Sequence, residues 1–248
     1  MPKARRFRPP FQAEAWHTPQ GRFIREVMFG INDGLVSTIG FVAGATSSLM
    51  QAHLVLLAGI ASVVAGSLSM GIGAYLASKS QREFFESEKA REHREIEEVP
   101  EDERREIRDI FAQMGFVKDE LEMIVNRITS NKDLWVRFMM REELGILEET
   151  VNPITIGLLM SAAFVAGSIP PLLPYMLLQD PLAALKMAVI VSLLALFLIG
   201  VAKTALTRQF WLKSGLEVMF LGSLATGIGF AIGKIVSLLW PEVGKVGF

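Results

Sequence analysis

The chain has 248 residues, of which 51% are hydrophobic, and its mean hydropathy of +0.38 is high for a water-soluble domain. It contains no cysteine, which excludes disulfides and thiolate metal sites. The net charge of −1 conceals a strong segregation, because residues 79–150 hold 20 of the 26 acids and 13 of the 25 bases. These features predict a membrane protein with one inserted polar domain and no nucleic-acid partner.

Five segments are long and apolar enough to cross a ~30 Å hydrocarbon core, which takes about 20 helical residues. A basic tail at residues 1–28 precedes them, and a short tail at 241–248 follows them. The five spans are expected near residues 29–50, 54–78, 154–177, 182–202 and 214–240.

One acid, Asp33, lies in the first apolar segment, and the stretch from Gly30 to Met50 carries no other acid or base. A charge at membrane depth costs about 2.5–3.5 kcal/mol even on the lenient insertion scale. A chain retains such a group where it faces a partner, a cavity or an ion. Asp33 therefore indicates a transport site, which a simple membrane anchor does not need.

The second span is predicted to continue beyond the membrane. From Leu54 to Glu98 there is no proline and no cluster of turn residues, so one helix of about 67 Å is expected at 1.5 Å per residue. Pro100 ends it. Three shorter helices are then expected at 101–113, 119–129 and 132–147, with Gly115 as a stop and Ser130 or Asn131 as a cap.

Candidate metal ligands in this polar domain fall in pairs that share a helix face. The pairs are Glu92 with Glu95, Glu103 with Glu106, and Met139 with Glu143. Carboxylates on two facing helices form an oxygen-rich site for a divalent cation, and a thioether beside them favours a softer ion such as Fe²⁺. The alternative for the acids is a solvated helix face, because arginines alternate with them. The alternative for Met139 is packing in the core.

Residues 151–240 hold the last three spans. The third ends in SIPPLLPY, where Pro170, Pro171 and Pro174 are expected to break or kink the helix. Lysine and arginine gather in the N-terminal tail and between spans four and five, which places the N-terminus and the polar domain in the cytoplasm. Glycines at packing distance, such as Gly40 and Gly44, fit either contacts within one subunit or a dimer seam.

Several stretches resemble the vacuolar iron transporter family. They are REVMFGINDGLVSTIGFVAG at 25–44, VVAGSLSMGIGAYLASKSQREF at 63–84, EHREIEEVPEDERREIRDI at 92–110, WVRFMMREELG at 135–145, and the PPLLPY and ALFLIGVAK runs. The resemblance covers about residues 22–235. It implies an all-α membrane protein with five transmembrane helices and a cytoplasmic three-helix metal-binding domain inserted between spans two and three.

The resemblance also implies site residues. The pore is expected at a homodimer interface and lined by Asp33 and Met70. The metal ligands of the cytoplasmic domain are expected at Glu92, Glu95, Glu103, Glu106, Met139 and Glu143. One position departs from the family pattern, because Ser62 stands where better-known members carry a glutamate, and this puts the route of proton coupling in question.

The function expected is therefore transport, not enzymatic catalysis. Fe²⁺ is the expected substrate, exported from the cytoplasm by proton antiport, with Mn²⁺ or Zn²⁺ as further ions for the cytoplasmic domain. The alternatives are a Mn²⁺ carrier of the same fold and a membrane-anchored protein that buffers or oxidises iron. The expected location is the cell membrane in a prokaryote or the vacuolar membrane in a eukaryote, in contact with lipid.

Overall fold

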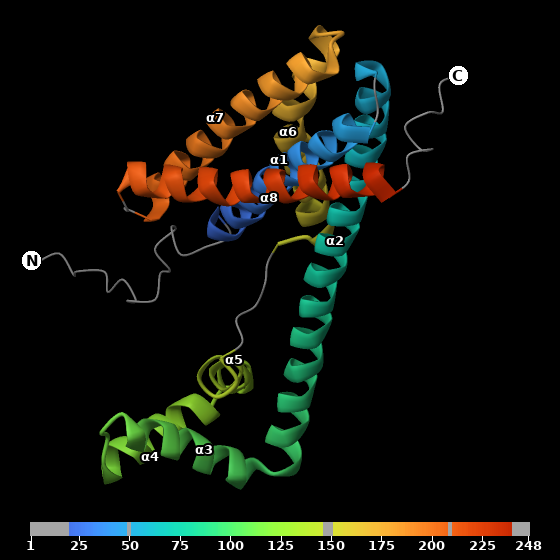
Figure 1. Ribbon diagram of the computed structural model, residues 1–248. Coiled ribbons are helices and arrows are strands. Elements are labelled where there is room, and N and C mark those ends of the chain that lie inside the picture. The colour runs from blue at the N-terminus through green and yellow to red at the C-terminus, as the bar shows by residue number, and fades with distance from the viewer. Residues whose placement is uncertain (1–19, 49–50, 146–150, 208–209, 240–248) are drawn as a thin grey trace, which may run out of the picture. The chain divides into compact units, whose positions relative to one another are not determined.

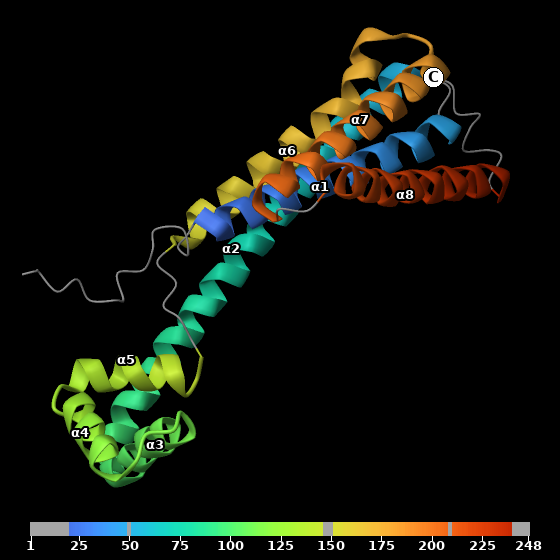
Figure 2. The ribbon, with the colours of Figure 1, turned by 90° about the vertical axis from the view of Figure 1, so that its left-hand side faces the viewer.

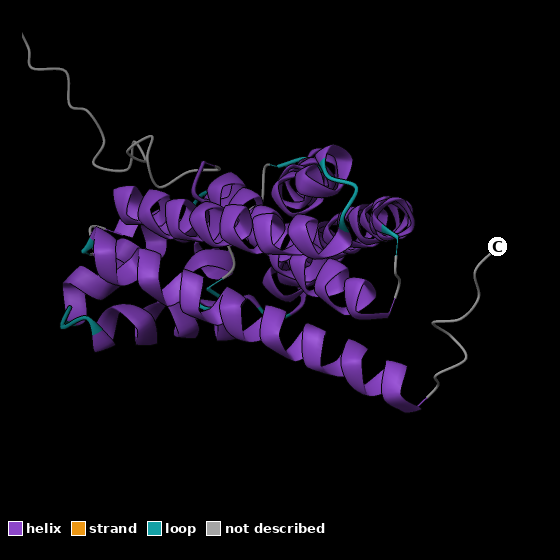
Figure 3. Cartoon of the chain, turned by 45° about the horizontal axis from the view of Figure 1, so that its top comes forward, coloured by secondary structure: helices purple, strands orange, loops and turns teal. Residues whose placement is uncertain are grey.

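A computed structural model describes residues 20–48, 51–145, 151–207 and 210–239. In this part of the chain there are helices and loops but no strand (Figure 3). The helices (Figure 1) are α1 (Gln20–Ser48), α2 (Ala52–Glu98), α3 (Pro100–Gln113), α4 (Lys118–Thr129), α5 (Lys132–Glu142), α6 (Pro153–Leu177), α7 (Pro181–Thr207) and α8 (Trp211–Leu239). The expected basic tail before residue 20 and the C-terminal tail lie outside the described residues.

Five of these helices, α1, α2, α6, α7 and α8, are long and apolar enough to cross a membrane. The all-helical fold and the five apolar helices expected from the sequence are therefore confirmed. The chain divides into two compact units. The membrane unit comprises residues 1–75 and 152–248, and the cap unit comprises residues 76–151.

Helix α2 belongs to both units and runs without interruption from Ala52 to Glu98, as its sequence predicts (Figure 1). Its polar half carries ion pairs one turn apart, including Lys79 with Glu83 at 3.6 Å and Arg82 with Glu86 at 3.1 Å. Exposed pairs of this kind each stabilise a helix by only about 0.3–0.5 kcal/mol. The helix ends where Pro100 begins α3, because proline is tolerated in a first turn but not inside a helix.

Of the break or kink expected at the proline cluster, the break is wrong. Helix α6 continues through Pro170, Pro171 and Pro174 to Leu177. Each of these prolines lacks the N–H that would bond the carbonyl four residues back, so the helix continues without those three hydrogen bonds. The backbone N–H of Leu178 still donates to the carbonyl of Pro174 at 2.9 Å and closes the last turn.

In the membrane unit, α1 packs along both α6 and α8, while α7 packs against α8 and α6 (Figure 2). The backbones of α1 and α6 touch, because a Cβ added at Gly34 would overlap the carbonyl of Phe164. Ser168 of α6 donates to the carbonyl of Gly34 at 3.2 Å, and Thr38 of α1 donates to Ser168 at 3.0 Å. These contacts fix α1 at the centre of the unit.

The glycines of α1 and α8 face each other within one chain. A Cβ added at Gly229 would lie 2.7 Å from the carbonyl of Gly40, and one added at Gly233 would lie 2.5 Å from that of Gly44. Small residues allow this close approach of helices in lipid. For this stripe, the structure supports packing within the subunit.

The cap unit has a hydrophobic core of its own, with α4 packed against α3 and α5. The buried residues of this core are Ile96, Ile107, Val125, Ile128, Trp135, Val136, Met139 and Met140. Gly115 ends the α3 segment with φ +97°, and Asn131 caps α5 by accepting from the N–H of Leu134 at 3.0 Å, as expected. Helix α5 is shorter than predicted and ends at Glu142, because the chain turns at Gly145 with φ +64°.

Candidate metal centre

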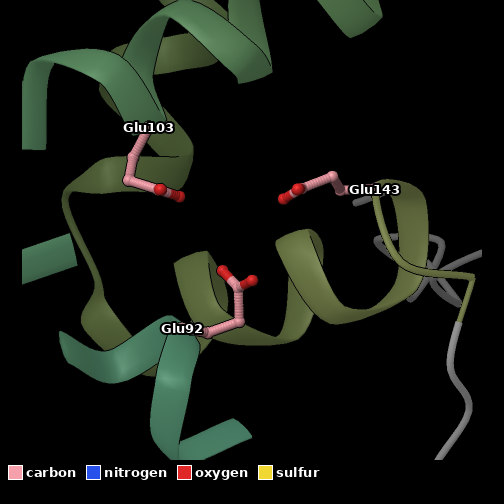
Figure 4. Close-up of side chains that lie close together, drawn as sticks. All are labelled: Glu92, Glu103 and Glu143. Carbon is pink, nitrogen blue, oxygen red and sulfur yellow. The ribbon is translucent and has the colours of Figure 1, made fainter. Parts of the chain in front are cut away.

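Three glutamates converge in the cap unit, of which Glu92 and Glu103 are buried and Glu143 is exposed (Figure 4). Glu92 comes from α2, Glu103 from the first turn of α3, and Glu143 from the C-cap position directly after α5. One carboxylate oxygen from each lies within 4.8 Å of the others. Three oxygens at this separation can hold one divalent cation between them.

The turn between α2 and α3 brings the first two glutamates together. Val99 is the N-cap of α3 and Pro100 its first residue, so the chain changes direction within two residues of the end of α2. Glu103 in the first turn of α3 therefore faces back toward Glu92. Glu143 lies at the C-terminal end of α5, where unsatisfied carbonyls carry partial negative charge, which also favours a cation.

Two of the three carboxylates have buried oxygens without a hydrogen-bond partner. The exposed fraction is 1% for Glu92 and 5% for Glu103. Neither oxygen of Glu92 nor Oε2 of Glu103 has a hydrogen-bond partner among the described residues. A buried ionised carboxylate without a partner is costly, so such a group either takes up a proton or binds a cation. A solvated acidic face does not have this property.

The pKa values of these groups reflect that environment. Burial, followed by the charges of Glu143 and Glu95, raises the pKa of Glu92 to about 7. Burial, followed by the charges of Glu106 and Glu92, raises the pKa of Glu103 to about 7. Burial and the neighbouring Glu106 also raise the pKa of Glu143. A divalent cation between the carboxylates acts in the opposite direction, because it favours their charged form.

We expect the stability of the metal-free cap unit to fall as pH rises from 4.5 to 7. In the unfolded chain Glu92 and Glu103 titrate near 4.5, whereas in the folded unit they titrate near 7. The folded state thus binds more protons across this range, and the free energy of unfolding decreases with pH. Thermal unfolding of residues 76–151, followed by circular dichroism, should give a lower melting temperature at pH 8 than at pH 5.

Added Mn²⁺, which resists air oxidation, should raise the melting temperature more at pH 8 than at pH 5, since the carboxylates are then already deprotonated. The control is a variant with Glu92→Gln and Glu103→Gln, in which the dependence on pH should flatten. A wild-type unit that melts at the same temperature at both pH values would contradict the buried, unpaired state of these acids.

The other expected ligands, Glu95, Glu106 and Met139, are not members of this three-carboxylate cluster. Glu95 is half-buried and pairs with Arg91 at 3.2 Å, and Arg91 also holds Glu88 at 3.2 Å. Glu106 is half-buried beside Glu143. Met139 is fully buried in the core of the cap unit. The structure thus brings together one member of each expected pair, and the solvated-face interpretation fits the exposed acids that pair with arginine.

The sequence did not single out Arg104. Its guanidinium lies over the ring of Trp135, 5.7 Å from the ring centroid, and it makes a 3.7 Å ion pair with Glu101. It is the residue next to Glu103, yet its charge is directed toward the ring and the exposed acid. This cation–π contact leaves the buried oxygen Oε2 of Glu103 without a basic partner.

The membrane residues are placed as follows. Asp33 is half-buried on α1, and no basic side chain of the described residues lies within ion-pair distance of it. Met70 on α2 packs against the core cluster that includes Val63 and Phe164. Ser62, also on α2, is half-buried. Their joint role in a pore stays a prediction.

The hydroxyl groups near Asp33 bond within the protein. Ser37 donates to the carbonyl of Gly34 at 3.4 Å, and Thr38 donates to Ser168. Ser37 thus bonds the backbone of its own helix, as hydroxyls in membrane helices commonly do. Thr38 instead links α1 to α6.

Comparison with known proteins gives a consistent result. The model of the VIT family matches residues 24–234. The vacuolar iron transporter 1 of Arabidopsis thaliana is 37% identical over 221 residues, which cover 89% of this chain and 88% of the relative. The vacuolar iron transporter 2 of Oryza sativa subsp. japonica is 37% identical over 225 residues, with 89% and 90% covered. Protein CCC1 of Saccharomyces cerevisiae is 28% identical over 228 residues, with 87% and 69% covered.

Proposed function

Because the chain belongs to the VIT family, we propose that it is a transporter, not an enzyme, and that it moves a divalent metal ion, with Fe²⁺ as the expected substrate, out of the cytoplasm. The observation that carries the proposal is the pair of buried, unpartnered carboxylates at Glu92 and Glu103. A divalent cation neutralises both, and Glu143 supplies a third oxygen. The cap unit is then a capture site for the ion.

The remaining cap residues adjust this site. Glu106 lies beside Glu143, so its carboxylate adds negative potential that concentrates cations. Glu95 provides a further carboxylate if it exchanges its partner Arg91 for the metal. Met139 adds a thioether from the core, which favours Fe²⁺ over Mg²⁺ and Ca²⁺.

The membrane step is assigned to Asp33 and Met70. Asp33 carries the only negative charge in its apolar segment and has no basic partner among the described residues, so a cation in the pore is its natural counter-ion. In a homodimer with the pore at the subunit interface, two copies of each residue converge on one ion. Proton and metal then compete for the same carboxylate, which is the physical basis for proton antiport.

The proposed topology follows from charge and from the relatives. The positive-inside rule places the N-terminus and the cap unit in the cytoplasm. Relatives named as vacuolar iron transporters support a vacuolar membrane for a eukaryotic protein, and the cell membrane is the corresponding place in a prokaryote.

Mn²⁺ is the second candidate substrate. The converging ligands are three carboxylate oxygens, and oxygen ligands suit Mn²⁺. Uptake of Fe²⁺, Mn²⁺ and Zn²⁺ into liposomes containing the purified protein, with a metal-sensitive dye inside, separates the candidates. Saturable uptake with Fe²⁺ fastest is expected. If the protein binds metal but no ion enters the liposomes, transport is contradicted and a protein that buffers or oxidises iron is favoured.

Ser62 allows a test of proton coupling. It lies eight residues before Met70 on α2, about 12 Å along the helix axis. Without a carboxylate at this position, only Asp33 carries a proton within the pore. We expect wild-type metal transport to depend less steeply on the pH gradient than transport by the Ser62→Glu variant. Both are measured in the same vesicles across increasing gradients, and equal slopes would mean that coupling does not pass through this position.

A further inference from the structure

A cavity opens in the membrane unit where α1 begins, α7 ends and α8 begins. In Figure 1 the end of α7 lies beside the start of α8, and α1 packs along α8. The cavity has a volume of about 360 Å³ and is lined by residues that include Met28, Asn32 and Val36 of α1, Ile199 and Lys203 of α7, and Val218 of α8. Its volume lies within the ~300–1,000 Å³ that is typical of small-molecule sites.

The lining of the cavity is charged at one end and apolar at the other. Among the described residues that line it, Lys203 is the one that carries a charge, and it lies one turn before the end of α7. Val36 and Ile199 lie farther inside the apolar helices α1 and α7. The described lining residues include no acid. Phe210 and Trp211, both more than half exposed, follow in the connection to α8, and aromatic residues of this kind mark the level of the lipid headgroups.

We propose that this cavity binds an anionic phospholipid of the surrounding leaflet, with an acyl chain in the apolar groove and the phosphate at Lys203. A lysine on a flexible stem at headgroup level reaches a phosphate, while the apolar lining excludes a free anion from the deeper part. In the topology proposed above, this is the cytoplasmic leaflet. The inference is independent of metal transport, because it uses neither the cap ligands nor Asp33.

The test uses the full chain in detergent, with phosphatidylglycerol and phosphatidylcholine of equal chain length added in equal amounts. Native mass spectrometry then counts the lipids that remain bound. The wild-type protein should retain phosphatidylglycerol about five-fold over phosphatidylcholine, the ratio that ~1 kcal/mol for one lysine corresponds to. Lys203→Gln should bring the ratio near one, and Lys203→Arg should keep it.

Two further variants separate the site from general surface charge. Lys213→Gln removes an exposed lysine of α8 that does not line the cavity, so the ratio should not change. Val36→Phe fills the groove and should lower retention of both lipids. The inference is overturned if Lys203→Gln keeps the preference, or if Lys213→Gln abolishes it equally.

A second copy of the chain is the competing occupant. Because the chain has no cysteine, a single Val218→Cys variant reports on contact between copies without background. The lipid site predicts no disulfide between copies in membranes treated with an oxidant. Efficient cross-linking together with absence of bound lipid would assign the groove to a protein interface and overturn the proposal.

Discussion

Replacing Asp33 with asparagine should reduce the initial rate of metal uptake by about 100-fold, the equivalent of ~2.7 kcal/mol at 1.36 kcal/mol per factor of ten. The substitution keeps the shape of the side chain and one carbonyl oxygen, but removes the charge. Asp33 is the only ionisable residue between Gly30 and Met50, so no neighbouring acid replaces it. This loss in transport is similar in size to the free energy of placing a charged side chain at membrane depth, which is about 2.5–3.5 kcal/mol.

Folding should survive this change, because Asp33 has no ion pair among the described residues and Gly34 and Thr38 form the contacts with α6. Elution as a single species from size exclusion checks this. Asp33→Glu, which keeps the charge, should retain part of the rate. Glu217→Gln, an exposed acid on α8, is the matched control and should transport like the wild type. Wild-type uptake by Asp33→Asn would remove this residue from the ion path.

The second large effect concerns the cap unit. We expect the double variant Glu92→Gln, Glu103→Gln to lose metal affinity by at least about 100-fold, since it removes two of three anionic ligands and second-sphere changes alone cost about 10–100-fold. The metal-free double variant should also be more stable than the wild type at pH 8, because two buried unpaired charges are gone. A loss of binding caused by misfolding would instead lower stability, so the two measurements together distinguish the causes.

Calorimetric titration with Mn²⁺ and thermal unfolding of the same samples provide these measurements. The control is Glu86→Gln with Glu101→Gln, which removes two exposed acids and should leave affinity within about three-fold, as for surface charges in high dielectric. Transport by the Glu92, Glu103 variant should fall less than transport by Asp33→Asn, because the cap unit supplies ions to the pore. Unchanged metal affinity would mean that Glu92 and Glu103 are not metal ligands and belong to a solvated acidic face.

The helices of the cap unit could be predicted because their signals are local. Pro100, Gly115 and Asn131 each fix a boundary by their own backbone or side-chain chemistry, and the structure places α3, α4 and the start of α5 accordingly. The end of α5 was predicted too late, since the periodic apolar pattern continued past the turn at Gly145. The proline cluster predicts a break or kink in α6, yet the helix continues to Leu177 without the three N–H donors that the prolines lack. Its packing against α1 and α7, which buries Pro171 and Pro174, is not visible in the local sequence.

The candidate centre could be predicted only in part. Helical spacing gives the acids that share a face, so Glu92 and Glu95 were equivalent in the sequence. The structure separates them, because Glu92 points into the cap unit while Glu95 turns to Arg91 on the same helix. Which acids lack partners depends on how α3 and α5 pack around α2, and a one-dimensional pattern does not contain that information. The same holds for Gly40 and Gly44, whose partners on α8 are nearly 190 residues away.

The most direct test of the account is simultaneous measurement of metal influx and internal pH in liposomes that contain the wild-type protein, with Fe²⁺ outside and an acidic interior. Metal entry is predicted to be saturable and accompanied by alkalinisation of the interior, since each ion that reaches Asp33 displaces a proton. Metal entry without proton movement would contradict the antiport step and indicate a uniporter. No entry beyond that of protein-free liposomes would contradict transport itself.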